Sequence, residues 1–398
     1  MVKIYIIWPV RGGGFMIFTY ICVIVEPNSL LWAEMKKICL SIAALLLSLL
    51  AHSQEADTLG RHAEFTIIPR LDGGLTSHIL NRGFDKAQFN LGTSSLYTLF
   101  EGSISEHVSF ILCNHWLAAG EGAPRWLYDG TLRSDMTNWI DYCCLEFNAG
   151  PFTFGIGKDS IFTGGFEFDE WDYDCHPEMN TALWNVLPVY QWGASVGYTT
   201  PSEMTTFSLQ MAASPFGEHP FSSGLWAWSG KWTGEYGPLS TLWTATAAQN
   251  ADRKLEWLVC LGQKLALGDW TLEFDWFSKV GLWYSEYDCE EFPSLIPPFF
   301  YNDYWEDGST LLGRVVYSPI ENLELEAKYI FEGKQLFKKY GDGLRTGGLA
   351  VRWMTDDFIR LHAAAGYSDH NIYGDFNGMY ANLGVTFFIN VNKLFRKK

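Results

Sequence analysis

Six carboxylates crowd one short stretch of this chain. They are Glu167, Asp169, Glu170, Asp172, Asp174 and Glu178, and no Lys or Arg lies among them. Like charges held in a narrow, partly dehydrated opening raise the local concentration of oppositely charged ions, so this run predicts a constriction that attracts cations. Two other interpretations stay open. The run is a solvated acidic loop outside any opening, or its Asp oxygens bridge a divalent cation, although it lacks the Gly and terminal Glu of a calcium loop.

Charged side chains also recur at every second position of several segments further along the chain. In Leu323 to Phe331, for example, they alternate with Leu, Ala, Tyr and Phe. Successive side chains of a β-strand point to opposite faces, so such a segment has one apolar and one polar face. We expect the polar faces to line a water-filled lumen and to carry Glu256, Lys264, Glu273, Asp275, Glu324, Glu326, Lys328, Arg352, Arg360 and His362.

The two-faced pattern divides most of the chain into about sixteen segments of roughly ten residues, the strand length of a membrane barrel. They lie near residues 64–71, 87–102, 107–118, 138–148, 151–160, 188–199, 204–213, 224–235, 239–248, 254–267, 270–280, 310–317, 323–331, 347–354, 358–367 and 378–390. Tight turns alternate with longer loops between them. This predicts an all-β fold, a transmembrane antiparallel up-and-down β-barrel of about 16 strands. The segment 138–148 fits worst, because Asp141 and Glu146 would fall on opposite faces.

Composition supports this class and excludes others. Hydrophobic residues make up 48% of the chain, yet after Gln54 no apolar run approaches the ~18 residues of a membrane helix. The 45 acidic and 28 basic residues give a net charge of −17, which argues against nucleic acid as a partner. Strands of a soluble β-sandwich or propeller also alternate polar and apolar residues. They run to only about five or six residues, however, and lack continuous apolar outer faces.

The N-terminal region predicts export. Met35-Lys-Lys, an apolar run from Ile38 to Leu50, and Ala51-His-Ser53 have the form of a signal peptide, residues 35–53, cut after Ser53. Residues 1–34 are then an upstream extension from a mis-assigned start, and residues 54–398 form the outer-membrane barrel. The alternative is an N-terminal membrane helix at residues 15–25, which is far shorter than the ~20 residues that a span needs.

One segment carries a family resemblance. Phe154-Gly-Ile-Gly-Lys-Asp-Ser-Ile-Phe-Thr-Gly-Gly-Phe-Glu-Phe-Asp169 resembles the corresponding stretch of Bacteroidota outer-membrane porins of the phosphate-selective porin-like family. The resemblance implies a sixteen-stranded barrel, commonly a homotrimer, whose third external loop folds into the pore. In this chain that loop is Phe162 to Asn185. It has no Lys or Arg, so the resemblance does not extend to phosphate as the solute.

The sixth long loop and the cysteines leave alternatives open. The sixth long loop, Leu282 to Gly308, mixes aromatic residues with acids, which suits either stacking against sugars or packing at the barrel mouth. Cys113, Cys143, Cys144 and Cys260 lie in strand-like segments and are expected to be small wall residues. Cys175 and Cys289 fall in the two longest loops, and the sequence leaves their pairing undecided.

The function expected is an outer-membrane porin that lets small hydrophilic solutes or ions diffuse passively, with a preference for cations. No Ser-His-acid set shares a local frame, so an enzyme is not expected, and neither a cofactor nor a metal is implied. The expected partners are outer-membrane lipid, small hydrophilic solutes and, from the resemblance, further copies of the chain. The alternatives are a surface binding or adhesion barrel with a plugged pore, and a barrel hydrolase.

Overall fold

In a computed structural model the chain separates into two compact units, Met1–Thr58 and Leu59–Lys398. The structure describes residues 62–80, 83–84, 88–90, 94–117, 140–174, 176, 179–181, 183–184, 187, 189–217, 223–250, 253–280, 308–334, 343–370 and 378–395. These residues all belong to the second unit. The predicted signal peptide, most of the sixth long loop, and Cys175, Glu178 and Cys289 lie outside them.

The second unit is built almost entirely from antiparallel strands. Their bounds are β1 His62–Leu80, β2 Gly83–Phe84, β3 Gln88–Asn90, β4 Ser95–Ser105, β5 Val108–Leu117, β6 Ile140–Ala149, β7 Phe152–Ser160, β8 Tyr190–Thr199, β9 Thr205–Ala213, β10 Trp226–Tyr236, β11 Leu239–Gln249, β12 Leu255–Leu267, β13 Trp270–Val280, β14 Gly308–Ile320, β15 Leu323–Lys334, β16 Gly343–Asp356, β17 Ile359–His370, β18 Gly378–Phe387 and β19 Ile389–Asn390. Helices are short, with η2 at Phe166–Asp169, η3 at Asp172–Asp174 and α4 at Val391–Phe395. No helix among the described residues has the length and apolarity to cross a membrane.

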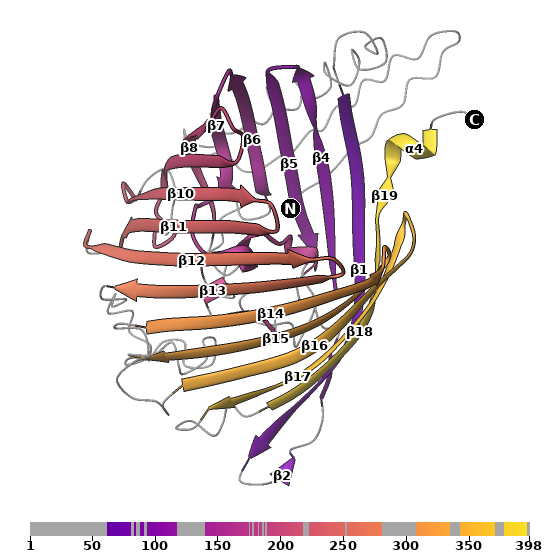
Figure 1. The fold of residues 1–398 in the computed structure, drawn as a ribbon. Helices are drawn as coiled ribbons and strands as arrows, with labels where there is room; N and C mark the ends of the chain where they lie inside the picture. Colours follow the sequence, from indigo (N-terminus) through magenta and orange to yellow (C-terminus); the bar gives the residue numbers. More distant parts are fainter. Residues whose placement is uncertain are drawn as a thin grey trace, which may run out of the picture. The chain divides into compact units, whose positions relative to one another are not determined.

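The strands close into one barrel. Each long strand pairs with its neighbours in the sequence, and β1 pairs with β4 on one edge and with β18 on the other. The short strand β3 extends β4 along β1, β19 extends β18, and β2 pairs with the end of β1 outside the barrel ladder, so the nineteen segments form a barrel of sixteen strands. Figure 1 shows β1 beside β18 and β19, where the ends of the sheet meet. The predicted fold class is confirmed, although β1 and β16 are longer than expected.

Along most of the barrel the strands present an apolar face outward and a polar face inward. On β15, Leu325 is 41% exposed, whereas the next residue, Glu326, is 8% exposed. The outward band continues through Leu349 on β16 and Leu383 on β18, both with large exposed side chains. Trp270 and Trp353 lie beside the tight turns, where their rings suit a lipid–water interface. The alternation predicted from the sequence is therefore present in three dimensions.

The tight turns lie along one rim. They join β4 to β5, β6 to β7, β8 to β9, β10 to β11, β12 to β13, β14 to β15 and β16 to β17. Gly150, Gly237 and Gly268 supply positive φ angles of 59°, 66° and 59° in three of these turns, a conformation that glycine adopts without steric cost. The start of β1 and helix α4 meet at the same rim, where the Phe65 amide donates to Asn392 Oδ1 at 2.9 Å.

Strand β6, the poorest fit to the alternating pattern, contains a β-bulge that changes which face its side chains occupy. Cys113 on β5 pairs with Tyr142, but the next residue, Asn114, pairs with Ile140, so Asp141 is an extra residue. A bulge shifts the alternation by one position. Asp141 is consequently buried, with its Oδ2 atom 4.0 Å from Nδ1 of His115, while Glu146 lines the lumen. Both carboxylates thereby avoid lipid, which no regular strand could achieve.

Candidate pore constriction formed by the third loop

The third loop, residues 162–185, leaves β7 and turns into the barrel. Hydroxyl groups on β11 hold its first residues: Thr246 Oγ1 donates to the Phe162 carbonyl at 2.7 Å, and Thr244 Oγ1 donates to the Gly164 carbonyl at 2.9 Å. The Phe162 amide donates to Gln210 Oε1 on β9 at 2.9 Å. Since these three wall residues face the lumen, the loop lies within the barrel, as the family resemblance implied.

A single carboxylate fixes the first turn of the loop. Asp275 on β13 is fully buried and accepts hydrogen bonds from the amides of Phe166, at 3.2 Å, and Glu167, at 3.0 Å. Those amides begin the short helix η2 and have no partner within it, so a carboxylate suits this end. A Cβ atom on Gly165 would collide with the Asp275 carboxylate, which explains the second Gly of Gly164-Gly165.

Glu167 makes the most buried ion pair of the loop. Lys328 Nζ on β15 lies 2.8 Å from Glu167 Oε1 and also donates to Asn180 Oδ1 at 2.8 Å. The Thr181 amide and hydroxyl donate to the two Glu167 oxygens at 2.9 and 2.5 Å. The carboxylate therefore ties the first half of the loop to its second half and to the wall.

A ladder of alternating charges crosses the wall behind the loop. Arg314 on β14 contacts Glu170 of the loop, Glu273 at 3.1 Å and Glu326 at 3.0 Å. Lys264 continues the ladder on one side, 3.0 Å from Glu273. On the other side Arg352 lies 2.5 Å from Glu326 and 3.2 Å from Glu324. Predicted wall residues from β12 to β16 thus form one network.

The second half of the loop rests on arginines. Asp174 makes an ion pair with Arg360 on β17, and its carbonyl accepts from Arg352 at 3.4 Å. The Tyr173 carbonyl accepts from both Arg70 and Arg360 at 3.0 Å. Three of the six predicted loop acids, Glu167, Glu170 and Asp174, are therefore bound to Lys or Arg on the wall.

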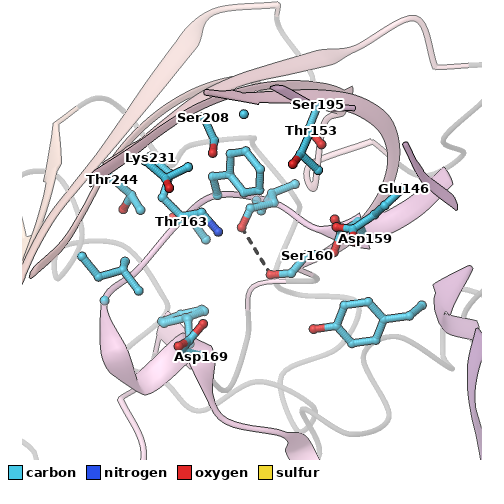
Figure 2. Close-up of a pocket in the computed structure, with 18 residues that line it drawn as sticks. Glu146, Thr153, Asp159, Ser160, Thr163, Asp169, Ser195, Ser208, Lys231 and Thr244 are labelled. Carbon is cyan, nitrogen blue, oxygen red and sulfur yellow. Dashed lines mark hydrogen bonds between the residues drawn. The ribbon is translucent and has the colours of Figure 1, made fainter. Parts of the chain in front are cut away.

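A cavity of about 400 Å³ lies on the other side of the loop, between the loop and strands β6 to β11. Hydroxyl side chains dominate its lining, and they are Thr153, Ser160, Thr163, Ser195, Thr206, Ser208 and Thr244. Figure 2 shows Glu146 and Asp159 close together on the wall, with Asp169 on the loop and Lys231 on the far side. The Lys231 amine lies 4.3 Å from the centre of the Phe162 ring.

The structure divides the predicted residues into two groups. Asp169 lines the cavity, whereas Glu167, Glu170 and Asp174 face the basic wall. Glu256 is buried, with its Oε1 atom accepting from Asn250 at 3.0 Å, and His362 contacts Asp72. The side chain of Asp172 and all of Glu178 lie outside the described residues. Among the described residues, no group of three metal-ligating side chains could hold a metal ion.

Sequence reasoning missed several residues of this site. Glu146, Asp159 and Lys231 line the cavity, and Arg70 and Arg314 hold the loop, but none was a candidate. Arg314 could have been found from the alternation, because it occupies an inward position of β14 between two outward positions. Asp159 and Lys231 lie in segments rich in Gly and Ser, where the contrast between faces is weak.

Comparisons with known proteins bear on the fold. No family model matches the sequence, and no curated protein matches it. Among solved structures, a loop L8 deletion mutant of OmpT, an outer membrane protein of Vibrio cholerae, has a TM-score of 0.54 at 9% identity, covering 83% of this chain and 100% of that chain. The outer membrane channel DcaP of Acinetobacter baumannii has a TM-score of 0.54 at 12% identity, covering 83% and 98%. An anion-selective porin from Comamonas acidovorans has a TM-score of 0.53 at 9% identity, covering 82% and 100%.

At these identities the likeness defines the fold: the chain is a closed sixteen-stranded barrel of the bacterial outer-membrane porin type. The predicted outer-membrane location agrees with this fold and with its apolar outer face. A place in the phosphate-selective porin-like family of Bacteroidota stays a prediction.

Proposed function

We propose that the protein is a porin through which small hydrophilic solutes cross the outer membrane passively, between the third loop and the wall formed by β6 to β11. The observation that carries this proposal is the position of the loop. Its ion pairs and its buried Asp275 contact are with β13 to β17, and a hydroxyl-lined cavity separates part of it from β6 to β11. Hydroxyl groups replace part of a solute's hydration without trapping one sign of charge, so they suit diffusion rather than tight capture.

Conductance in a planar lipid bilayer tests the proposal. Purified, folded protein should produce stepwise conductance increases that scale with salt concentration. An insertion-competent barrel with no conductance would favour the alternative of a surface binding barrel with a plugged lumen. Hydrolysis of lipid or peptide substrates that depends on a lumen side chain would favour the barrel hydrolase.

The second part of the proposal is a preference for cations. We assign this preference to carboxylates that line the cavity rather than to the whole acidic run of the loop. The ion pairs among the described residues involve Glu167, Glu170 and Asp174 of the loop, and none involves Glu146, Asp159 or Asp169. These three carboxylates share the cavity with one base, Lys231. Charge at a narrow passage acts on every ion, whereas paired charge behind the loop is largely cancelled.

Reversal potentials under a salt gradient test this assignment. Asp169→Asn and Asp159→Asn, alone and together, should move the reversal potential toward zero, and higher salt should weaken the parent's preference. Asp357→Asn, at an exposed turn between β16 and β17, is the matched control and should leave it unchanged. An anion-selective parent would contradict the cation preference, while an unchanged double variant would move its origin away from this cavity.

Assembly as a homotrimer is the third part. A structure of OmpT from Vibrio cholerae in a trimer form has a TM-score of 0.50 at 10% identity, covering 82% of this chain and 99% of that chain, and supports the idea by its fold alone. The lipid-facing strands supply the outer surface that both lipid and further copies would contact. Multi-angle light scattering of the detergent-solubilised barrel should give three chains per particle.

A further inference from the structure

A buried histidine lies where the third loop meets the wall. His176 is 5% exposed, and its ring lies 5.5 Å from the ring of His362 on β17, with the two planes inclined at 61°. The described charged groups around it come from three strands. They are Arg70 and Asp72 on β1, Arg352 on β16 and His362 on β17. The neighbourhood therefore holds two arginines and one carboxylate beside the two histidines.

The carboxylate is already engaged. Asp72 accepts from Arg70 Nε at 2.9 Å and from Asn382 Nδ2 at 3.4 Å, while its other oxygen lies 2.6 Å from His362 Nε2. Arg352 is bound to Glu326 and Glu324, and it donates to the Asp174 carbonyl. The Nδ1 atoms of His176 and His362 are both buried without a hydrogen-bond partner. A proton on His176 would thus add a positive charge beside two arginines, where the one carboxylate among the described neighbours is already shared.

Other contacts hold the loop on both sides of His176. Upstream of His176, Arg70 and Arg360 donate to the Tyr173 carbonyl. Downstream, the Met179 amide donates to the His176 carbonyl at 2.7 Å, and the Met179 side chain packs against Ala350, Ala364 and Tyr380. His176 lies between these two attachments, so electrostatic repulsion between a protonated His176 ring and the arginines would weaken both.

We propose that His176, facing His362, is an acid-sensitive latch that holds Tyr173, Asp174, Met179 and Asn180 of the third loop against the wall while its ring is neutral and releases them when the ring takes up a proton. The latch concerns the loop itself, and it holds whether or not the barrel conducts. Its physical basis is the crowding of Arg70, Arg352 and His362 around one ring, with Asp72 shared by three other donors.

The direction of the effect follows from proton linkage. Burial, together with Arg70 and His362, holds the pKa of His176 well below its usual value of 6.5. The released loop therefore binds a proton more readily than the docked loop, and docking is fully present above pH 6.5 and weakens as the pH falls below it. The docking equilibrium should fall about tenfold for each pH unit below 6.5, until the pH reaches the pKa of the docked ring.

Hydrogen exchange of the folded barrel in detergent tests the latch. The Asp174 and Met179 amides, both hydrogen-bonded within the loop, are followed at pH 7.5 and 5.5 after correction for the intrinsic pH dependence of exchange. Their protection should fall about tenfold at pH 5.5. His176→Gln should remove this pH dependence. His107→Gln, at an exposed turn between β4 and β5, is the matched control and should keep it.

A second variant keeps the test decisive if Gln at position 176 prevents docking altogether. His362→Gln removes one of the groups that oppose a proton on His176, so the release should need a lower pH. Equal protection at both pH values in the parent, an unchanged pH dependence in His176→Gln, or an unchanged midpoint in His362→Gln would each overturn the latch. Loss of conductance at every pH would instead contradict the proposed porin function and leave the latch standing.

Discussion

Asp275 shows how a single buried charge can place a loop. Among the described residues its carboxylate accepts from two backbone amides of the third loop and touches no Lys or Arg. Gly165 and Gly262 leave room around it, because a Cβ atom at either position would crowd its oxygens. A carboxylate in such a place is costly to bury, and the amides at the start of η2 offset that cost.

We predict that Asp275→Ala loosens the loop without unfolding the barrel. Two amides lose a charged acceptor, and hydrogen bonds of this kind contribute about 1.5 to 3 kcal/mol each. Single-channel recordings should show larger or noisier open-state currents. Asp357→Ala, at a turn outside the lumen, should behave like the parent, and an unaltered current in Asp275→Ala would mean that other contacts place the loop.

The Glu167–Lys328 pair is the second residue-scale test. Lys328→Met should destabilise the docked loop by about 3 to 5 kcal/mol, because Glu167 is left buried without its cation. Adding Glu167→Gln should restore most of the loss, since the neutral amide still accepts from Thr181. Protection of the Thr181 amide in hydrogen exchange measures both. Additive losses in the double variant would show that the two side chains do not act as a pair.

At the scale of the element, the third loop carries its own apolar anchors. Leu183 and Leu187 pack with Ile161 against Leu258 and Phe277 of the wall. Tyr173 joins a second cluster with Tyr97, Leu99 and Cys113. A loop of this length has no core of its own, so these side chains use the inner wall as their core.

Strand β15 gives the element-scale prediction. Leu325→Arg should reduce barrel stability by about 2 to 4 kcal/mol if the residue lies near the bilayer midplane, because a charge would then face lipid. Glu326→Gln should leave insertion unaffected, since that side chain faces the lumen. Folding yields in lipid vesicles measure both variants. Equal losses would place β15 in the opposite register.

The charge ladder also revises a simple expectation for β15. From the alternation alone, Glu326→Arg should be tolerated, because the side chain faces water. In the structure Glu326 lies between Arg314 and Arg352, at 3.0 and 2.5 Å. A third arginine there would repel both, so we expect this substitution to disturb the loop that Arg314 also binds.

At the scale of the whole molecule, an outer-membrane barrel requires export, which the proposed signal peptide would provide. The proposed signal peptide, residues 35–53, implies that the protein reaching the outer membrane begins at Gln54. Intact-mass analysis of protein from the outer-membrane fraction should give the mass of residues 54–398. A mass that includes residues 1–34 would contradict the proposed start site.

The sequence by itself determined the barrel. Alternation of period two depends only on local backbone geometry, and it is strongest where one face meets lipid, so strands such as β13 and β15 could be predicted almost residue by residue. The inward position of Asp275, Glu326 and Lys328 could be predicted for the same reason, whereas the folding of the third loop into the lumen was implied only by the family resemblance. The bulge at Asp141 could not, because it depends on the pairing of β6 with β5.

Only the tertiary structure decided which charges meet. Glu167 and Lys328 are separated by 161 residues, and Asp72 and His362 by 290. No local pattern relates such pairs, because their contact depends on barrel closure and on the side of the lumen that the loop takes. The acidic run therefore forms one cluster in the sequence, but in the barrel Asp169 lines the cavity while Glu167, Glu170 and Asp174 contact the basic wall.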